Sequence, residues 1–180
     1  MKERKYKEDW SLQEDWDAKN RPRRTPVYRG PVYRTPESRR TLLVRSAVPW
    51  VFWLILLVLY FPLNFPGATV LYVFLPAALA LFPGLYWLLG IWGILRAPRE
   101  MTRLQKENSI GRILRSAAGC AILNLAALIG DLILVLTGPL FPQEWPGMAL
   151  LACSLMIAIF TAGFFRDADR RLQEERKENP

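Results

Sequence analysis

Apolar residues along this chain are collected into four long runs, and polar residues lie between and outside them. The runs cover residues 47–63, 68–95, 113–136 and 148–165. A helix needs ~20 predominantly apolar residues to cross the roughly 30 Å hydrocarbon core of a bilayer, and every run approaches or exceeds that length. The pattern predicts an all-α integral membrane protein whose four transmembrane helices form two hairpins.

The second apolar run is the longest, so a straight helix over it would exceed the thickness of the hydrocarbon core. It contains Pro83-Gly84. Because sharp bends in long helices usually occur at such residues, a kink is expected there.

The distribution of positive charge predicts the orientation. All 24 Lys and Arg residues lie in residues 1–46, 96–115 and 166–180, and the connectors 64–67 and 137–147 contain none. Cytoplasmic loops carry the excess of Lys and Arg, so both termini are expected in the cytoplasm. Glu144, in the second cation-free connector, is then expected to be accessible to labelling from outside.

Residues 1–46 are predicted to form a disordered, basic cytoplasmic arm, since they contain 13 Lys or Arg, 7 Asp or Glu and few aliphatic residues. A tandem repeat within the arm, PVYRG followed by PVYRT, begins at Pro26. Its Tyr28, Arg29, Tyr33 and Arg34 form a candidate surface for anionic headgroups or a partner protein. The alternative is a basic tether that only enforces topology. Nucleic acid is not expected as a ligand.

Two further charged segments are expected to extend helices into the cytoplasm. In the connector 96–112, Glu100, Arg103 and Glu107 are spaced for ion pairs on one helical face, which predicts an extension of the second span. Residues 166–180 form a charged tail of mixed sign, and its segment 167–178 is expected to continue the fourth helix.

The third apolar run carries the candidate intramembrane polar site, Asp131 and Asn124. Together with Cys120 and Ala127 they follow a spacing of four, three and four residues, which places them on one narrow helical face. Polar side chains in hydrocarbon usually face other helices, so this face should point into the bundle. Asp131 has two alternative roles, a structural hydrogen bond or the binding of a proton or cation.

The two cation-free connectors contain similar tripeptides, Phe65-Pro66-Gly67 and Trp145-Pro146-Gly147. Each places a proline where a following helix can begin. The similarity is compatible with two duplicated hairpins, but Phe82-Pro83-Gly84 shows the same tripeptide recurring within the second run. A three-residue match favours chance.

The residues needed for common enzyme chemistry are missing from the sequence. The chain has no His, and its two cysteines lie within apolar runs, where they are expected to act as small packing residues. No GxSG motif, metal-ligand cluster or pair of intramembrane carboxylates is recognised. The sequence therefore predicts neither an enzyme nor a metal or cofactor site.

Two function classes remain. The first is a non-enzymatic accessory, assembly or scaffold subunit of a membrane complex, which requires no motif. The second is a small oligomeric transporter or channel subunit that uses Asp131. The expected partners are the lipid bilayer and a membrane protein or further copies of this chain. The expected location is a cell membrane, most simply the inner membrane of a bacterium.

Overall fold

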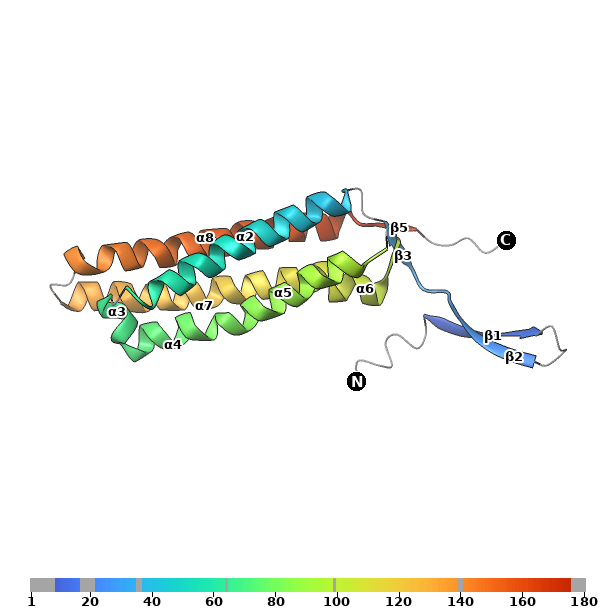
Figure 1. The fold of residues 1–180 in the computed structure, drawn as a ribbon, viewed down its shortest axis with the longest axis horizontal. Helices are drawn as coiled ribbons and strands as arrows, with labels where there is room; N and C mark the ends of the chain where they lie inside the picture. Colours follow the sequence, from blue (N-terminus) through green and yellow to red (C-terminus); the bar gives the residue numbers. More distant parts are fainter. Residues whose placement is uncertain are drawn as a thin grey trace.

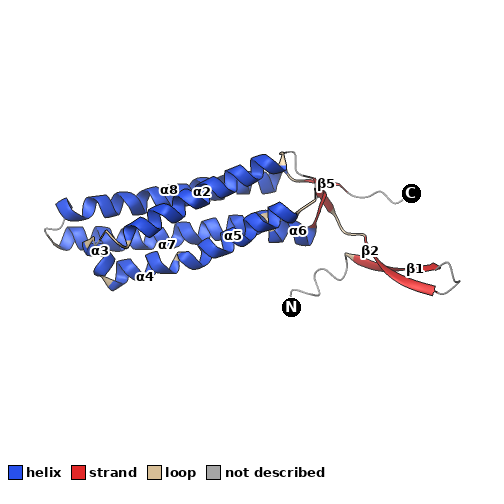
Figure 2. Ribbon diagram, viewed as in Figure 1, coloured by secondary structure: helices blue, strands red, loops and turns tan. Residues whose placement is uncertain are grey.

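The computed structural model describes residues 9–16, 22–34, 37–63, 65–98, 100–138 and 141–175. Long helices form an elongated bundle, and short strands lie beyond one of its ends (Figure 1). Figure 2 shows the same separation of helices from strands along the long axis. We call the end nearest the strands the proximal end and the opposite end the distal end.

Four helical segments are long and apolar enough to cross a membrane, as predicted. They are Arg39–Tyr60, Leu71–Arg96, Arg103–Thr137 and Gln143–Arg171. Large apolar side chains cover their outward surfaces, whereas the bundle interior holds a smaller set of fully buried residues. This distribution is typical of helices surrounded by lipid, because the lipid-facing surface does not need to be polar.

Helix α2 (Arg39–Tyr60) begins earlier and ends earlier than the predicted span 47–63. The Ser38 side chain accepts a hydrogen bond from the backbone N–H of Thr41, which caps the first turn. The helix ends at Tyr60, two residues before Pro62, which has no backbone N–H to continue the helical hydrogen bonds. Hydrophobicity marks the part of a helix inside the membrane, whereas capping determines where the helix starts.

The second span is divided into α3 (Pro66–Thr69), α4 (Leu71–Leu79) and α5 (Leu81–Arg96). The α4–α5 break lies at Ala80, three residues before the predicted position at Pro83. Pro83 explains the shift, because a proline has no N–H for the carbonyl four residues earlier and clashes with it. That carbonyl belongs to Leu79, the last residue of α4.

Helices α7 (Ile110–Thr137) and α8 (Phe141–Arg171) form the second antiparallel hairpin. Helix α8 also packs on α2, while α5 packs on both α2 and α7, so the four long segments form a closed bundle. Gly90 allows the close approach of α5 to α7. A Cβ atom at this position would lie 2.5 Å from Cγ1 of Ile113 and 3.2 Å from its backbone nitrogen.

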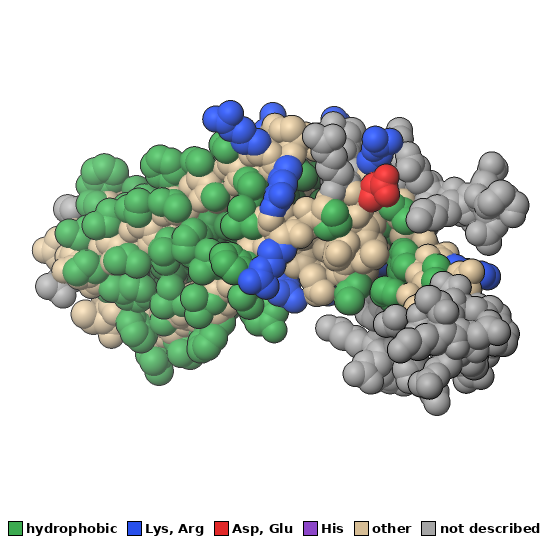
Figure 3. All heavy atoms as spheres, turned by 45° about the vertical axis from the view of Figure 1, so that its right-hand side comes forward, with side chains coloured by type: hydrophobic (Ala, Val, Ile, Leu, Met, Phe, Trp, Pro, Cys, Tyr) green, Lys and Arg blue, Asp and Glu red, His purple; other side chains and the backbone are tan. Residues whose placement is uncertain are grey.

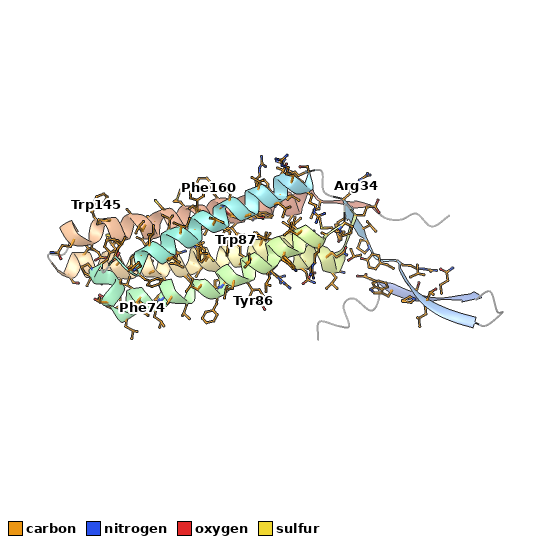
Figure 4. The ribbon with its side chains drawn as sticks, in the orientation of Figure 1. Arg34, Phe74, Tyr86, Trp87, Trp145 and Phe160 are labelled. Atoms are coloured by element: carbon orange, nitrogen blue, oxygen red, sulfur yellow. The ribbon has the colours of Figure 1, made fainter. Side chains whose placement is uncertain are left out.

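Two tryptophans form the centre of the bundle. Trp53 and Trp87 have no exposed surface, and their ring centroids are 6.3 Å apart. Figure 4 shows Trp87 among the helices, while the neighbouring Tyr86 points outward. The Trp53 ring lies directly against Gly84, where a side chain would clash with it. The Trp50 indole N–H donates to the Gly84 carbonyl at 2.9 Å, which further holds α2 against the start of α5.

The connector after α5 does not continue that helix, so this prediction was wrong. Helix α5 ends at Arg96, and Ala97 adopts extended backbone before Pro98. The chain then forms strand β4 (Glu100–Thr102) and the short helix α6 (Arg103–Asn108). A capping box between Thr102 and Gln105 starts α6. The charge spacing correctly indicated a helix in this region, but that helix is α6, which is separate from α5.

Strands occur in the predicted disordered arm and near the end of the predicted helical tail, which continues α8 only as far as Arg171. β1 (Trp10–Trp16) pairs with β2 (Pro22–Tyr28), and β3 (Val32–Arg34) lies between β4 and β5 (Gln173–Glu175), all antiparallel. Val32 and Met101 are buried in the three-stranded sheet. Thus three segments that are too short to fold alone bury apolar side chains together. Residues 1–8, 17–21, 35–36 and 176–180 of the arm and tail lie outside the described ranges.

Candidate functional site

The small and polar face of α7 points into the bundle, as the sequence predicts. Cys120, Asn124, Ala127 and Asp131 are all fully buried. The Cys120 thiol donates to the Ala80 carbonyl at 3.7 Å, beside the break between α4 and α5. The spacing along the helix therefore identified the interior face correctly. Cys153, also expected to pack inside, is exposed instead.

Asp131 belongs to a polar cluster at the distal end of the bundle. Its neighbours are Tyr60 from the end of α2, Gly67 from α3 and Glu144 from the start of α8. We call these four residues the distal acidic site. Helix α3 contacts both α7 and α8, and the polar groups come from both hairpins, so the site joins them.

Gly67 lies at the centre of the distal acidic site. Its backbone N–H donates to Oε2 of Glu144 at 2.9 Å. A Cβ atom on Gly67 would lie 2.7 Å from Oε1 of Glu144, 3.0 Å from the Tyr60 hydroxyl and closer still to Oδ1 of Asp131. Only glycine allows three oxygen atoms to converge so near the backbone.

The distal acidic site contains both carboxyl groups of residues 108–166. Residues 108–166 contain only two acidic residues, Asp131 and Glu144, and residues 38–99 contain none. Both side chains are fully buried, and one oxygen atom of each carboxyl group lies within 3.0 Å of the position that a Gly67 Cβ atom would take. Two adjacent buried carboxyl groups repel each other when both are ionised. The repulsion is relieved when one or both groups are protonated or when a cation is bound.

No cationic side chain supplies that charge. Residues 46–95 and 116–165 contain neither Lys nor Arg, and the ion pairs of the described residues lie elsewhere. Four oxygen atoms in the site have no hydrogen-bond partner in the described structure: Oδ1 and Oδ2 of Asp131, Oε1 of Glu144 and the Tyr60 hydroxyl. Such groups are costly to bury unless a ligand, proton or water satisfies them.

Two predictions about Glu144 were wrong. It is fully buried within α8 and is not an exposed residue of the connector, so it is unsuitable as a labelling site for the outer surface. It also completes a carboxylate pair that the sequence analysis did not recognise. The helix starts at Phe141, ahead of Pro146, whereas the similar tripeptide at Pro66 does begin a helix. Figure 4 shows Trp145 at this end of the bundle.

Asn124 lies deeper on the same face of α7 and does not contact the distal acidic site through any described hydrogen bond. Neither its amide oxygen nor its nitrogen has a partner in the described structure. The buried hydroxyls of Ser46, Ser154 and Thr161 instead donate to carbonyls of their own helices. Asn124 and the distal acidic site are thus the unsatisfied polar positions along this part of the α7 face.

The two tyrosines of the predicted arm surface contact the connector of the same chain. The Tyr28 hydroxyl accepts from the backbone N–H of Arg103 at 3.2 Å, and the Lys106 ammonium lies 4.6 Å from the centre of the Tyr33 ring. Arg29 and Arg34 are exposed. The tyrosines therefore attach the arm to the bundle, and the arginines face outward.

The described residues contain no group of three or more His, Cys, Asp or Glu side chains arranged to hold a metal ion. The distal acidic site has only two side chains of these types, Asp131 and Glu144, beside the phenol of Tyr60. In comparisons with known proteins, the chain matches no family model, no curated protein and no solved structure.

Proposed function

We propose that this protein is a non-enzymatic accessory, assembly or scaffold subunit of a membrane complex, with both termini in the cytoplasm. The observation that carries the proposal is the placement of β1 and β2. This two-stranded hairpin extends away from the proximal end of the bundle (Figure 1) and is attached to it through Tyr28 and β3. A protein with this arrangement presents an element to a partner beside the membrane.

The hairpin has features of a binding element. Among the described residues, β1 and β2 pair only with each other, so each has one edge without a strand neighbour. Open strand edges bind extended segments of partner proteins by adding a strand. Trp10 and Leu12 are 51% and 68% exposed. An isolated two-stranded hairpin is only marginally stable in water, and a partner strand would stabilise it.

The proposed orientation is supported by the positions of the cationic segments. Segments 39–46, 96–115 and 166–171 lie at the proximal end, whereas the cation-free connectors lie at the distal end. Lys and Arg side chains border a broad apolar surface in Figure 3. Arginines at this border stack on aromatic rings, at 4.7 Å for Arg45 on Phe164, 4.7 Å for Arg96 on Trp92 and 5.7 Å for Arg112 on Tyr86. Such pairs suit the headgroup region of the cytoplasmic leaflet.

The proposal is tested by extracting the complex from native membranes in mild detergent and measuring its mass. Full-length protein is expected to purify with a larger membrane protein in fixed stoichiometry. Deletion of residues 9–28 should release that protein while the thermal midpoint of the bundle stays unchanged, because the hairpin contributes little to the core. A complex that survives the deletion, or full-length protein found only as a monomer or homo-oligomer, contradicts the proposal.

The second candidate function is a small transporter or channel subunit that uses Asp131. It is favoured by the buried carboxyl pair, with the unsatisfied Asn124 amide deeper on the same face of α7. In proteoliposomes, Asp131→Asn retains hydrogen bonding but cannot ionise. Loss of proton or cation flux with unchanged folding supports transport, and absence of flux in the unmodified protein excludes it under those conditions.

A further inference from the structure

We propose that the outer edge of β1 binds an extended, basic segment of a partner protein, which adds a third strand to the hairpin. This inference rests on the proposed accessory function and specifies the binding edge and the chemistry of the partner. It follows from the direction of the backbone N–H groups, from the exposed apolar side chains of β1 and from the charge of this strand.

The pairing of β1 with β2 determines which backbone N–H groups point outward. The Arg29 N–H donates to the Asp9 carbonyl at 2.8 Å, directly beside the pairing of Trp10 with Tyr28. Hydrogen-bonded and non-hydrogen-bonded pairs alternate along an antiparallel ladder. The pair of Trp10 and Tyr28 is therefore non-hydrogen-bonded, and its N–H groups point away from the ladder. The same holds for every second residue along both strands.

Proline interrupts the outer edge of β2 but not that of β1. The outward positions of β2 are Pro22, Arg24, Pro26 and Tyr28. The outward positions of β1 are Trp10, Leu12, Glu14 and Trp16. Proline has no N–H, so half of the outward donors of β2 are missing, and a further strand cannot pair continuously there. The edge of β1 has all its donors and can accept a partner strand.

The exposed side chains of β1 lie at the margin of an apolar face. Trp10 and Leu12 are two residues apart in the strand, so they project from the same face, where Tyr28 and Pro26 are their cross-strand neighbours. The Trp10 ring packs edge-on against the Tyr28 ring, with centroids 5.3 Å apart, yet Trp10 and Leu12 both remain exposed. A third strand with apolar residues opposite Trp10 and Leu12 would cover them.

The charge of β1 favours a basic partner. This strand contains Glu14 and Asp15 and no Lys or Arg, and the register of the hairpin pairs these acids with Arg24 and Arg23 of β2. Addition of a third strand places a second residue opposite each acid. Lys or Arg at these positions stabilises the sheet through opposite-charge pairs, whereas Asp or Glu destabilises it.

The same charge argues against two other occupants of this edge. Two copies that paired through β1 would bring the acids of both strands into one ladder, with no cation between them. An anionic membrane surface would also repel Glu14 and Asp15, and the hairpin extends away from the end of the bundle (Figure 1). A basic, extended protein segment is the occupant that matches both the backbone and the charge.

The test uses full-length protein in nanodiscs of zwitterionic lipid and a short fluorescent peptide in which alternating Val and Thr residues follow a pair of Lys residues. A matched peptide carries Glu in place of Lys. The Lys peptide is expected to bind about tenfold more tightly than the Glu peptide, because only its charges complement β1. At saturation it should slow amide exchange at Trp10 and Leu12, whose N–H groups point outward, and leave Arg24 and Tyr28 unchanged.

Three results would overturn the proposal. The first is equal binding, or no binding, of the two peptides. The second is slowed exchange at Arg24 and Tyr28 of β2 instead of at β1. The third is protection of Trp10 and Leu12 that rises with protein concentration in the absence of peptide, which would identify a second copy of the chain as the occupant. None of these measurements needs a variant to fold.

Substitutions at the two edges provide a matched comparison. Leu12→Pro removes an outward N–H from β1 and leaves the ladder to β2 intact, so the Lys peptide should bind roughly fivefold more weakly. Leu12→Val keeps both the N–H and an apolar side chain and should bind almost as well as the unmodified protein. Arg24→Pro makes the corresponding change on the outer edge of β2 and should not weaken binding. Weaker binding by Arg24→Pro alone would assign the site to β2 and contradict the proposal.

Leu12→Pro also separates this inference from the proposed function when the complex is extracted from native membranes. Loss of the larger membrane protein both from this variant and on deletion of residues 9–28 agrees with the function and with the edge. Its loss on deletion only, with full retention by Leu12→Pro, supports the function and contradicts the edge. Full-length protein without a larger partner contradicts the function, and the peptide measurements then decide the edge independently.

Discussion

Lys106 and Asp169 form an ion pair of 3.0 Å that joins α6 to the proximal end of α8. The same ammonium group lies over the Tyr33 ring of β3. One side chain thus connects the arm, the connector and the end of the last helix. These are the three segments in which all the cations of the chain are found, and the strands of the three-stranded sheet come from the same three segments.

Replacement of Lys106 by Met should loosen this connection without unfolding the bundle. Asp169 is partly exposed, so the ion pair and the cation–π contact together contribute only about 1 kcal/mol. Amide exchange in β3 and β4 should accelerate several-fold, with little change in α7. Lys106→Arg, which keeps the charge, serves as the control. Equal exchange rates in Lys106→Met and the unmodified protein would show that the contact does not stabilise the sheet.

Gly90→Val should destabilise the bundle because α5 and α7 are in contact at this glycine. The added Cβ atom would meet both the side chain and the backbone of Ile113, and overpacking of this kind typically costs about 1 to 3 kcal/mol. Gly163→Val is the matched control, since no atom lies within 4 Å of a Cβ at that position. Unfolding by heat or denaturing detergent should separate the two variants. Equal stability would contradict the close α5–α7 contact.

Hydrogen exchange should distinguish the two sheets of the arm. β3 is hydrogen-bonded on both sides and contains the buried Val32, whereas β1 and β2 form a two-stranded hairpin. In purified protein the amides of β3 are expected to be protected and those of β1 to exchange rapidly, since isolated hairpins are marginally stable. Rapid exchange in β3 as well would support the fully disordered arm that composition predicts.

The sequence predicted the bundle because its signals are local. Long apolar runs specify spans, and the spacing from Cys120 to Asp131 specifies a helical face, whatever the neighbouring helices are. The kink in the second span was also predictable from Pro83, apart from its position at Ala80, directly after the carbonyl partner of that proline. These features depend on residues that are near one another in the chain.

The partner of Asp131 was not predicted because it depends on where a helix starts. Glu144 stands in a polar segment beside Pro142 and Pro146, which is typical of a turn, yet α8 already begins at Phe141. The sequence did contain one signal that these two carboxyl groups are neighbours. Asp131 and Glu144 lie at similar distances on either side of Gly138, and antiparallel helices bring such positions together. Strand β3 of the arm was missed for a related reason, since its partners β4 and β5 are distant in the sequence.

The most direct test of the account is cysteine accessibility at the two ends of the bundle, because four spans with both termini inside is its central claim. Gln143→Cys and Leu104→Cys, both at exposed positions, are introduced singly after Cys120 and Cys153 are replaced by Ala. An impermeant maleimide is expected to label Gln143→Cys in intact cells and Leu104→Cys only after permeabilisation. Labelling of Leu104→Cys in intact cells, with Gln143→Cys protected, would contradict the proposed orientation. Equal labelling of both positions in intact cells would contradict the four-span bundle itself.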